Sequence, residues 1–284
     1  MELRPLYVLA FAVATTLGLL VLLQLGERVI SRHTIASDLK ADNAARRFVR
    51  VGQVLAVFLI SASAVKSSME GGSLGQDALW VTAFGATAVL LLSITGRLGI
   101  RLLLQGRLES EIDRGNRAAG LAAGAHYVAA GIITSRAIGG TDVHSLGVSL
   151  VFFVIAQLTL HVFVSLFRAL TTYDDAEQIH GENMAAALSY SGALIAFAII
   201  IARALDGDFV TWEVSLRGYG EVLLLALMLY PVRQLFVQVL MLHSGFTLRG
   251  GRLDAGIAVE RNEGMGAIEA AAYLATALSI ARLV

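Results

Sequence analysis

The chain has no cysteine, only two prolines and few charged residues, and each scarcity narrows the class of protein. The absence of cysteine excludes disulfides, thiolate catalysis and cysteine-ligated metal. Charged residues make up 15% of the chain, whereas a soluble domain has about 25%. The formal net charge is zero, which gives no electrostatic basis for binding nucleic acid. Apart from Pro5 and Pro231 there is no proline, and no long Gly/Ser/Pro linker interrupts the chain.

Apolar residues are abundant instead, at 56% of 284 residues, and they gather in runs long enough to cross a bilayer as helices. The chain is therefore expected to be an all-α polytopic membrane protein with eight transmembrane helices. The N-terminal run lacks the short apolar core and small-residue cleavage site of a signal peptide, so we expect it to be retained as the first span. The predicted spans are 5–27, 43–65, 77–104, 116–138, 145–170, 183–205, 214–243 and 262–283.

A fourfold internal repeat is anchored on asparagines at intervals of 67 to 79 residues, each followed by an Ala/Gly-rich apolar stretch. The clearest copies read "EIDRGNRAAG" from Glu111 and "QIHGENMAAA" from Gln178. Three copies also carry an arginine 20 residues after the asparagine, and 20 helical residues span about 30 Å, the thickness of the hydrocarbon layer. The asparagines and these arginines therefore mark opposite membrane faces. The residues are Asn43, Asn116, Asn183 and Asn262, with Arg136, Arg203 and Arg282.

Arginines before the asparagines and two tryptophans extend the repeat. Arg28, Arg101 and Arg168 each lie 15 residues before their asparagine. Trp80 and Trp212 precede Arg101 and Arg233 by the same 21 residues, so Arg233 is the equivalent residue in the fourth copy. We infer four parallel two-helix repeats, related by an axis along the membrane normal. The tryptophans suggest a duplicated four-helix unit, 1–140 with Asn43 and Asn116, and 141–284 with Asn183 and Asn262.

The composition of the spans predicts their places. Even-numbered spans are rich in Ala, Gly and Ser, which let helix backbones approach closely in lipid, so these spans should form an inner bundle. Odd-numbered spans are rich in Leu, Val and Phe and should face lipid. Most of the 22 Lys and Arg residues lie on the asparagine side, which the positive-inside rule places in the cytoplasm, with both termini outside. The exceptions are Arg4, Lys66, Arg136, Arg203, Arg217 and Arg282.

Two interpretations of the asparagine motif are open. An asparagine at the N-cap satisfies a free helix N–H, and nearby acids suit the positive end of the helix dipole. On this interpretation the motif is a capped, charge-complementary hairpin. Alternatively, the four asparagines and acids form a ring at a cytoplasmic ion mouth. The acids are Asp38, Asp42, Glu111, Asp113, Glu177, Glu182 and Glu260.

The second copy resembles the E-I-x-x-x-N-x-A-A signature of the YjfL-like bacterial inner-membrane family, a domain of unknown function. The matching residues are Glu111, Ile112, Asn116, Ala118 and Ala119, and Gln178 replaces the acid in the third copy. The chain resembles two four-helix members joined. The first copy departs from the signature at Asp38, Leu39 and Arg46, and the fourth at Ile257, Gly264 and Met265. The resemblance implies an inner-membrane location and outward termini, and it implies no activity.

Polar residues within the predicted spans are the main functional candidates. Arg50 and Glu269 each lie seven residues after their asparagine, and the equal depth predicts an ion pair that closes the inner ring, either structural or serving as a gate or proton site. Other polar side chains are expected near mid-membrane. A cluster of them could bind an ion or polar solute, or it could be interhelical hydrogen bonds worth about 0.6 kcal/mol each. The cluster comprises Arg50, Gln53, His126, Gln157, His161 and Glu269.

We expect no catalytic residue and no metal site, because no H-E-x-x-H, G-x-S-x-G or Walker A motif is present. No cofactor is expected either, although a haem held by His126 and His161 is a remote alternative. The segment 234–250 prolongs the fourth copy and is predicted to continue the seventh helix and to contact another subunit or a membrane partner. Two functional classes follow. One is a channel or transporter for a small ion or solute through the inner bundle, and the other is a non-conducting scaffold or accessory subunit.

Overall fold

The computed structural model describes residues 3–30, 35–69, 73–104 and 108–284, and this part of the chain contains helices joined by loops, without strands. Eight helical segments in it are long and apolar enough to cross a membrane. The eight predicted spans and the all-α fold class are therefore confirmed, and the protein is a multi-pass membrane protein. Seven spans are single helices: α1 (Leu3–Ile30), α3 (Ala44–Ser68), α4 (Leu74–Leu103), α6 (Arg117–Ala137), α7 (Val143–Arg168), α9 (Met184–Ala204) and α13 (Glu263–Leu283).

The span Trp212–Met241 changes its winding along its length. It runs through α10 (Trp212–Leu224), the 3₁₀ turn η1 (Leu225–Met228), α11 (Leu229–Arg233) and the π-helix η2 (Gln234–Met241). Pro231 lacks an N–H, so a regular hydrogen-bond ladder cannot continue through it. The prediction that the seventh helix continues beyond Arg233 is confirmed as far as Met241, but residues 242–250 are not helical. The helix ends at Met241, and the chain then folds back against it. Gln238 Nε2 of η2 donates to Thr247 Oγ1 (2.8 Å) across this bend.

Four short helices precede the inner helices, all at the asparagine end. They are α2 (Ile35–Lys40), α5 (Leu108–Asp113), α8 (Asp175–His180) and α12 (Arg252–Ala258). Each belongs to the loop between the outer and the inner helix of one repeat. In three of them an acid pairs with the arginine that ends the outer helix: Glu109 with Arg101, Asp175 with Arg168, and Asp254 with Arg233.

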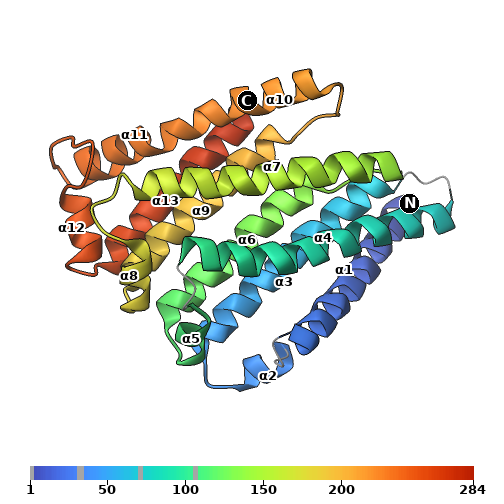
Figure 1. Ribbon diagram of the computed structural model, residues 1–284, viewed down its shortest axis with the longest axis horizontal. Helices are drawn as coiled ribbons and strands as arrows, with labels where there is room; N and C mark the ends of the chain where they lie inside the picture. The colour runs from blue at the N-terminus through green and yellow to red at the C-terminus, as the bar shows by residue number, and fades with distance from the viewer. Residues whose placement is uncertain (1–2, 31–34, 70–72, 105–107) are drawn as a thin grey trace.

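The helices form two layers (Figure 1). The inner layer is the row α3, α6, α9, α13, in which successive helices are in contact, and α1, α4, α7 and the α10–η2 span lie on the outer side. The predicted division into inner even-numbered and outer odd-numbered spans is confirmed. The predicted closed ring is not, because α3 and α13 lie at opposite ends of the row.

Glycines bring the inner helices into backbone contact. A Cβ atom on Gly52 of α3 would lie 2.2 Å from the carbonyl oxygen of Gly124 on α6, and one on Gly266 of α13 would lie 2.3 Å from that of Ala185 on α9. Side chains are thus excluded from these contact lines, which is how small residues promote helix association in lipid. Such contacts leave no space for a pore between α3 and α6 or between α9 and α13.

Candidate functional site

The asparagine of every repeat caps its inner helix. Its side-chain Oδ1 accepts from the backbone N–H three residues on, at 3.0 to 3.2 Å in all four copies. In three copies the Nδ2 group also donates to the short helix of the following repeat. The bonds run from Asn43 to Ile112 O (2.8 Å), from Asn116 to Ile179 O (2.9 Å) and from Asn183 to Ile257 O (2.8 Å). The motif therefore starts a helix and fastens one repeat to the next.

The flanking motif residues hold the carboxamide in this orientation. Asn116 Nδ2 donates to Glu111 Oε2 (2.9 Å), and Asn183 Nδ2 donates to Gln178 Oε1 (2.7 Å), which explains why glutamine can replace the acid. In three of the four copies the asparagine Nδ2 is hydrogen-bonded to the next repeat, and the inner helices form a row. The geometry therefore favours the capped hairpin over a ring of asparagines lining an ion mouth. Partial burial opposes the charged form of Glu111, but hydrogen bonds from Arg114 and Asn116 outweigh it and hold the pKa of the carboxyl below its usual range.

Two further motif acids, Glu182 and Glu260, form ion pairs at the surface. Glu182 Oε1 accepts from Arg114 of the preceding repeat (2.8 Å). Glu260 pairs with Arg252 of α12, which lowers the pKa of the glutamate. Exposed pairs of this kind contribute little to stability, because water and salt screen the charges. These acids therefore belong to the loop architecture.

Arg50 and Glu269 do not pair with each other, so the predicted ion pair was wrong. Their equal depth in the membrane does not fix the lateral distance between α3 and α13. Arg50 lies at the α3 end of the row. Its Nε donates to Asp38 of α2 (2.7 Å), and its Nη1 donates to Glu27 of α1 (2.8 Å) and to Gln53 (2.7 Å). All three partners are buried. We call Glu27, Asp38 and Arg50 the first triad.

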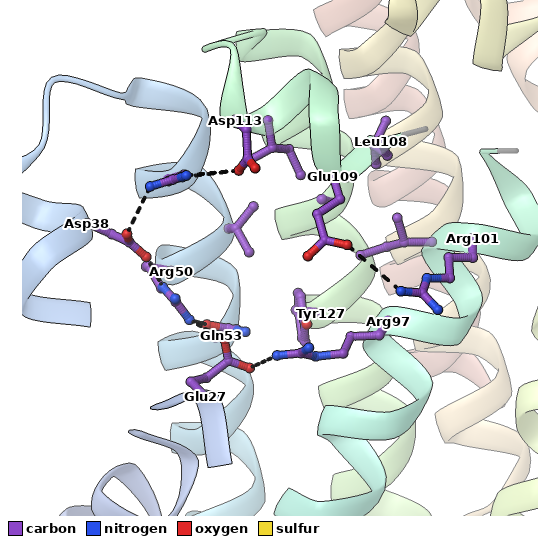
Figure 2. A pocket seen from close by; sticks show the side chains of 15 residues that line it. Glu27, Asp38, Arg50, Gln53, Arg97, Arg101, Leu108, Glu109, Asp113 and Tyr127 are labelled. Carbon is purple, nitrogen blue, oxygen red and sulfur yellow. Dashed lines mark hydrogen bonds and ion pairs between the residues drawn. The ribbon is translucent and has the colours of Figure 1, made fainter. Parts of the chain in front are cut away.

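A cavity of about 130 Å³ adjoins the first triad on the asparagine side of the first unit. Arg97 of α4 lines it and donates to the second oxygen of Glu27 (2.7 Å). Figure 2 shows the Glu27, Arg50 and Arg97 side chains converging beside Tyr127 and Gln53. Arg46, Arg101, Glu109 and Asp113 complete the charged lining, so the cavity presents equal numbers of acids and arginines.

A second triad, of Arg233, Asp254 and Glu269, lies in the fourth repeat. The Arg233 side chain is fully buried, and it donates from Nη2 to Asp254 of α12 (2.6 Å) and from Nε to Glu269 of α13 (2.5 Å). Asp254 also accepts from the backbone N–H of Thr172 (2.9 Å). The sequence identified Arg233 as a helix end, but Glu27 and Asp254 were not among the predicted site residues.

The two triads have the same plan with opposite polarity. In both, the inner helix supplies the residue seven positions after its asparagine and the short helix supplies an aspartate. The outer helix supplies glutamate and the inner helix arginine in the first triad, and the reverse holds in the second. Terminal repeats thus contain buried ionic locks, whereas the corresponding inner-helix positions in the middle repeats are Ala123 and Tyr190.

A third polar cluster lies where the two four-helix units meet. His126 of α6 is fully buried, its ring centroid is 6.1 Å from that of His161 of α7, and the buried Gln157 is one turn away. His161 Nδ1 bonds the backbone oxygen of Gln157 (2.6 Å), but several buried polar atoms have no partner in the described part of the chain. These are both ring nitrogens of His126, both amide atoms of Gln157, and His161 Nε2.

The structure therefore divides the predicted intramembrane cluster into three places, with Arg50 and Gln53 in the first unit, Glu269 in the fourth repeat, and the two histidines with Gln157 between the units. The ring of His126 lies against α4, where a Cβ on Gly99 would come within 1.9 Å of Nε2. Such packing does not fit a porphyrin beside this ring, so no step is assigned to haem. Among the described residues, no group of three or more His, Asp or Glu side chains is arranged to hold a metal ion.

A larger cavity, of about 910 Å³, opens at the opposite membrane end between α6, α7, α9 and α10. Its lining includes both units and charges of both signs. Residues that line it are Arg136, His144, Ser149, Arg203, Asp206 and Tyr219. The molecule thus has a polar cavity at each membrane end, with the histidine cluster at intermediate depth.

Asp175 of α8 gives a prediction for the pH dependence of stability. Burial raises its pKa to about 7 and outweighs the attraction of Arg168, whose Nε lies 3.2 Å from the carboxylate. Between the ordinary pKa of 3.8 and about 7, the folded state binds more protons than the unfolded state, so this group makes stability fall as pH rises. Asp175→Asn should flatten that decline, measured as melting temperatures in detergent at about pH 5 and about pH 8.

Asp142, at the opposite membrane face, provides the control. Hydrogen bonds from the backbone and side chain of Ser145 lower its pKa, so its contribution is lost on acidification instead. Asp142→Asn should therefore leave the decline toward high pH in place. A decline of equal slope in wild type and Asp175→Asn would contradict the assignment.

The family model described as Domain of Unknown Function (DUF350) matches the chain twice, over residues 1–138 and 141–284. Two fused copies of one membrane domain agree with this double match and with the fold. The protein belongs to this family. No curated protein and no solved structure matches the chain.

Proposed function

We propose that the protein passes a small ion or polar solute across the membrane between its two helix layers, at the junction of the two four-helix units. The observation that carries the proposal is the cluster of His126, Gln157 and His161, in which five buried side-chain N and O atoms have no partner among the described residues. Leaving such groups unsatisfied costs about 1–3 kcal/mol each, and intramembrane polar residues commonly mark ion or substrate pathways. The cluster can offer hydrogen bonds to a passing solute.

The positions of the two cavities support this route. Tyr127 lines the cavity on the asparagine side and is adjacent in sequence to His126. On the other side, Phe152 lines the larger cavity and Gln157 lies five residues further along α7, about 7.5 Å of helix. The cluster is therefore interposed in depth between the two cavities. The inner layer itself is a poor route, because its helices touch backbone to backbone.

That close packing is also the observation that favours the second candidate, a non-conducting scaffold or accessory subunit. On this alternative the triads and the histidine cluster only stabilise the helix layers. An enzymatic activity forms no part of either proposal, and neither includes a cofactor.

For the location we propose the bacterial inner membrane, with the asparagine loops cytoplasmic and both termini outside. The excess of Lys and Arg on the asparagine side supports this orientation. The narrower resemblance to YjfL-like proteins, carried by Glu111, Ile112 and Asn116, supports the choice of membrane. The segment 234–250 stays a predicted contact with another subunit or a membrane partner.

Flux into proteoliposomes separates the two candidates. Purified protein would be reconstituted and tested with a panel of inorganic cations, anions and small polyamines, beside empty liposomes. We expect at least one solute to enter faster with protein, and His126→Leu and Gln157→Leu to lower that rate toward the empty-liposome rate. His180→Leu, on the short helix α8, is the histidine control and should retain flux.

Two outcomes count against transport by this route. Wild-type rates equal to those of empty liposomes for the whole panel would favour the scaffold. Flux that persists in His126→Leu at the wild-type rate would place the path elsewhere. Melting temperatures of the variants, measured in parallel, distinguish a lost path from a lost fold.

A further inference from the structure

The contacts of α3 with α6 and of α9 with α13 follow one pattern. The earlier helix presents the residues 2, 9 and 13 positions after its asparagine, and the later helix receives them on small residues. From α3 to α6, Ala45 lies against Gly120, Gly52 against Gly124, and Ala56 against Gly131. From α9 to α13, Ala185 lies against Gly266 and Gly192 against Ala270. We call the presented surface the forward face and the receiving surface the rear face.

The forward face is buried on three inner helices and open on the fourth. The buried residues are Ala45, Gly52 and Ala56 on α3, Ala118, Ala125 and Ala129 on α6, and Ala185, Gly192 and Ala196 on α9. On α13 the equivalent residues, Gly264, Ala271 and Ala275, are all exposed. The fourth helix thus retains the residues of this contact, but no helix in the described part of the chain packs against them.

Asn262 gives an independent indication at the same edge. Its three equivalents each donate Nδ2 to a carbonyl of the following repeat. Asn262 caps α13 through Oδ1, but its Nδ2 has no partner in the described part of the chain and the residue is exposed. At the α13 end of the row, the asparagine Nδ2 therefore lacks the hydrogen bond that joins each earlier repeat to the next.

The α3 end of the row does not offer the matching surface. The rear-face positions, 4, 8 and 15 residues after the asparagine, are small on α6, α9 and α13: Gly120, Gly124 and Gly131, Ala187, Ser191 and Ala198, and Gly266, Ala270 and Ala277. On α3 they are Arg47, Val51 and Phe58. These bulkier side chains prevent an equally close approach, so copies of the chain cannot continue the row head to tail with the same spacing.

We propose that the forward face of α13 binds the forward face of α13 in a second copy of this chain, forming a twofold-symmetric dimer about an axis along the membrane normal. A twofold contact needs only one self-complementary surface, and it closes without leading to a filament. Ala267, Ala271, Ala275 and Ser279 recur every four residues along this exposed edge, the spacing that lets parallel membrane helices pack closely. The two Asn262 carboxamides then lie at the same end of the contact, within reach of each other.

The absence of cysteine makes disulfide cross-linking a direct test. Single variants Ala271→Cys and Ala275→Cys would be oxidised in native membranes, and a bond forms only where Cα atoms lie within about 7 Å. We expect both to give covalent dimers. Val51→Cys is the control, because it is exposed at a comparable depth on the opposite edge of the row, and it should stay monomeric.

Light scattering in detergent supplies a second measurement. The wild-type chain should have twice the monomer mass of 30.1 kDa, and Ala271→Leu should return it to the monomer mass. Because Ala271 is exposed within one copy, this variant should melt as a folded protein. The proposal is overturned if Val51→Cys cross-links as well as Ala271→Cys, or if the wild-type chain is monomeric and neither α13 variant cross-links. The test does not depend on whether the protein transports anything.

Discussion

Arg233→Met is expected to destabilise the protein by about 3–5 kcal/mol, the usual cost of removing one partner from a buried ion pair. The arginine side chain is fully buried, and it is the cation that neutralises both Asp254 and Glu269. Methionine fills a similar volume but leaves two carboxylates facing each other away from water. Unfolding of purified protein by SDS titration, or the melting temperature in detergent, measures the loss.

Arg217→Met, on the same span, is the matched control. Arg217 is exposed and, among the described residues, pairs only with Glu221 one turn on, so its loss should change stability by less than about 0.5 kcal/mol. An effect of Arg233→Met no larger than that of Arg217→Met would show that the second triad is not a structural lock.

The double variant Arg233→Glu with Glu269→Arg asks whether the polarity of a triad matters. The first triad already has this arrangement, with glutamate on the outer helix, arginine on the inner helix and aspartate on the short helix. The double variant should therefore recover much of the stability that either single charge reversal loses. If the double variant is as unstable as the two single losses combined, local packing, and not charge, decides the polarity.

Local sequence signals predicted the fold well. Long apolar runs predicted the eight spans, and the recurrence of Ala and Gly separated inner from outer helices. Both properties depend only on the composition of a single helix. The asparagine cap was also predictable, since Asn116 and Ala119 are only three residues apart. The structure within a single repeat can therefore be predicted from the sequence.

Lateral neighbours were not predictable in the same way. Arg50 and Glu269 share a depth, but they lie at opposite ends of a row, and their partners Glu27 and Arg233 come from the outer helices. The row could have been inferred from one comparison of the repeats. Val51 replaces the small residue that the other inner helices have at that position, so α3 lacks a surface that would close a ring.

Gly52→Ala is the smallest substitution with a large expected effect. The added Cβ would lie 2.2 Å from the carbonyl oxygen of Gly124, and backbone cannot move aside as a flexible side chain can. Overpacking of this kind costs about 1–3 kcal/mol and sometimes more. It opposes a gain of about 0.8–1.0 kcal/mol from the higher helix propensity of alanine, so the net loss understates the steric cost.

Gly18→Ala isolates that propensity gain. Gly18 lies inside α1, and a Cβ there meets nothing within 4 Å, so the same substitution should leave stability unchanged or raise it slightly. Melting temperatures of both variants in one detergent give the comparison. If backbone contact between α3 and α6 holds the inner layer together, Gly52→Ala should lower the melting temperature and Gly18→Ala should not. If Gly52→Ala is as stable as Gly18→Ala, α3 and α6 can separate at low cost. Close packing would then no longer argue against a solute path between these two helices.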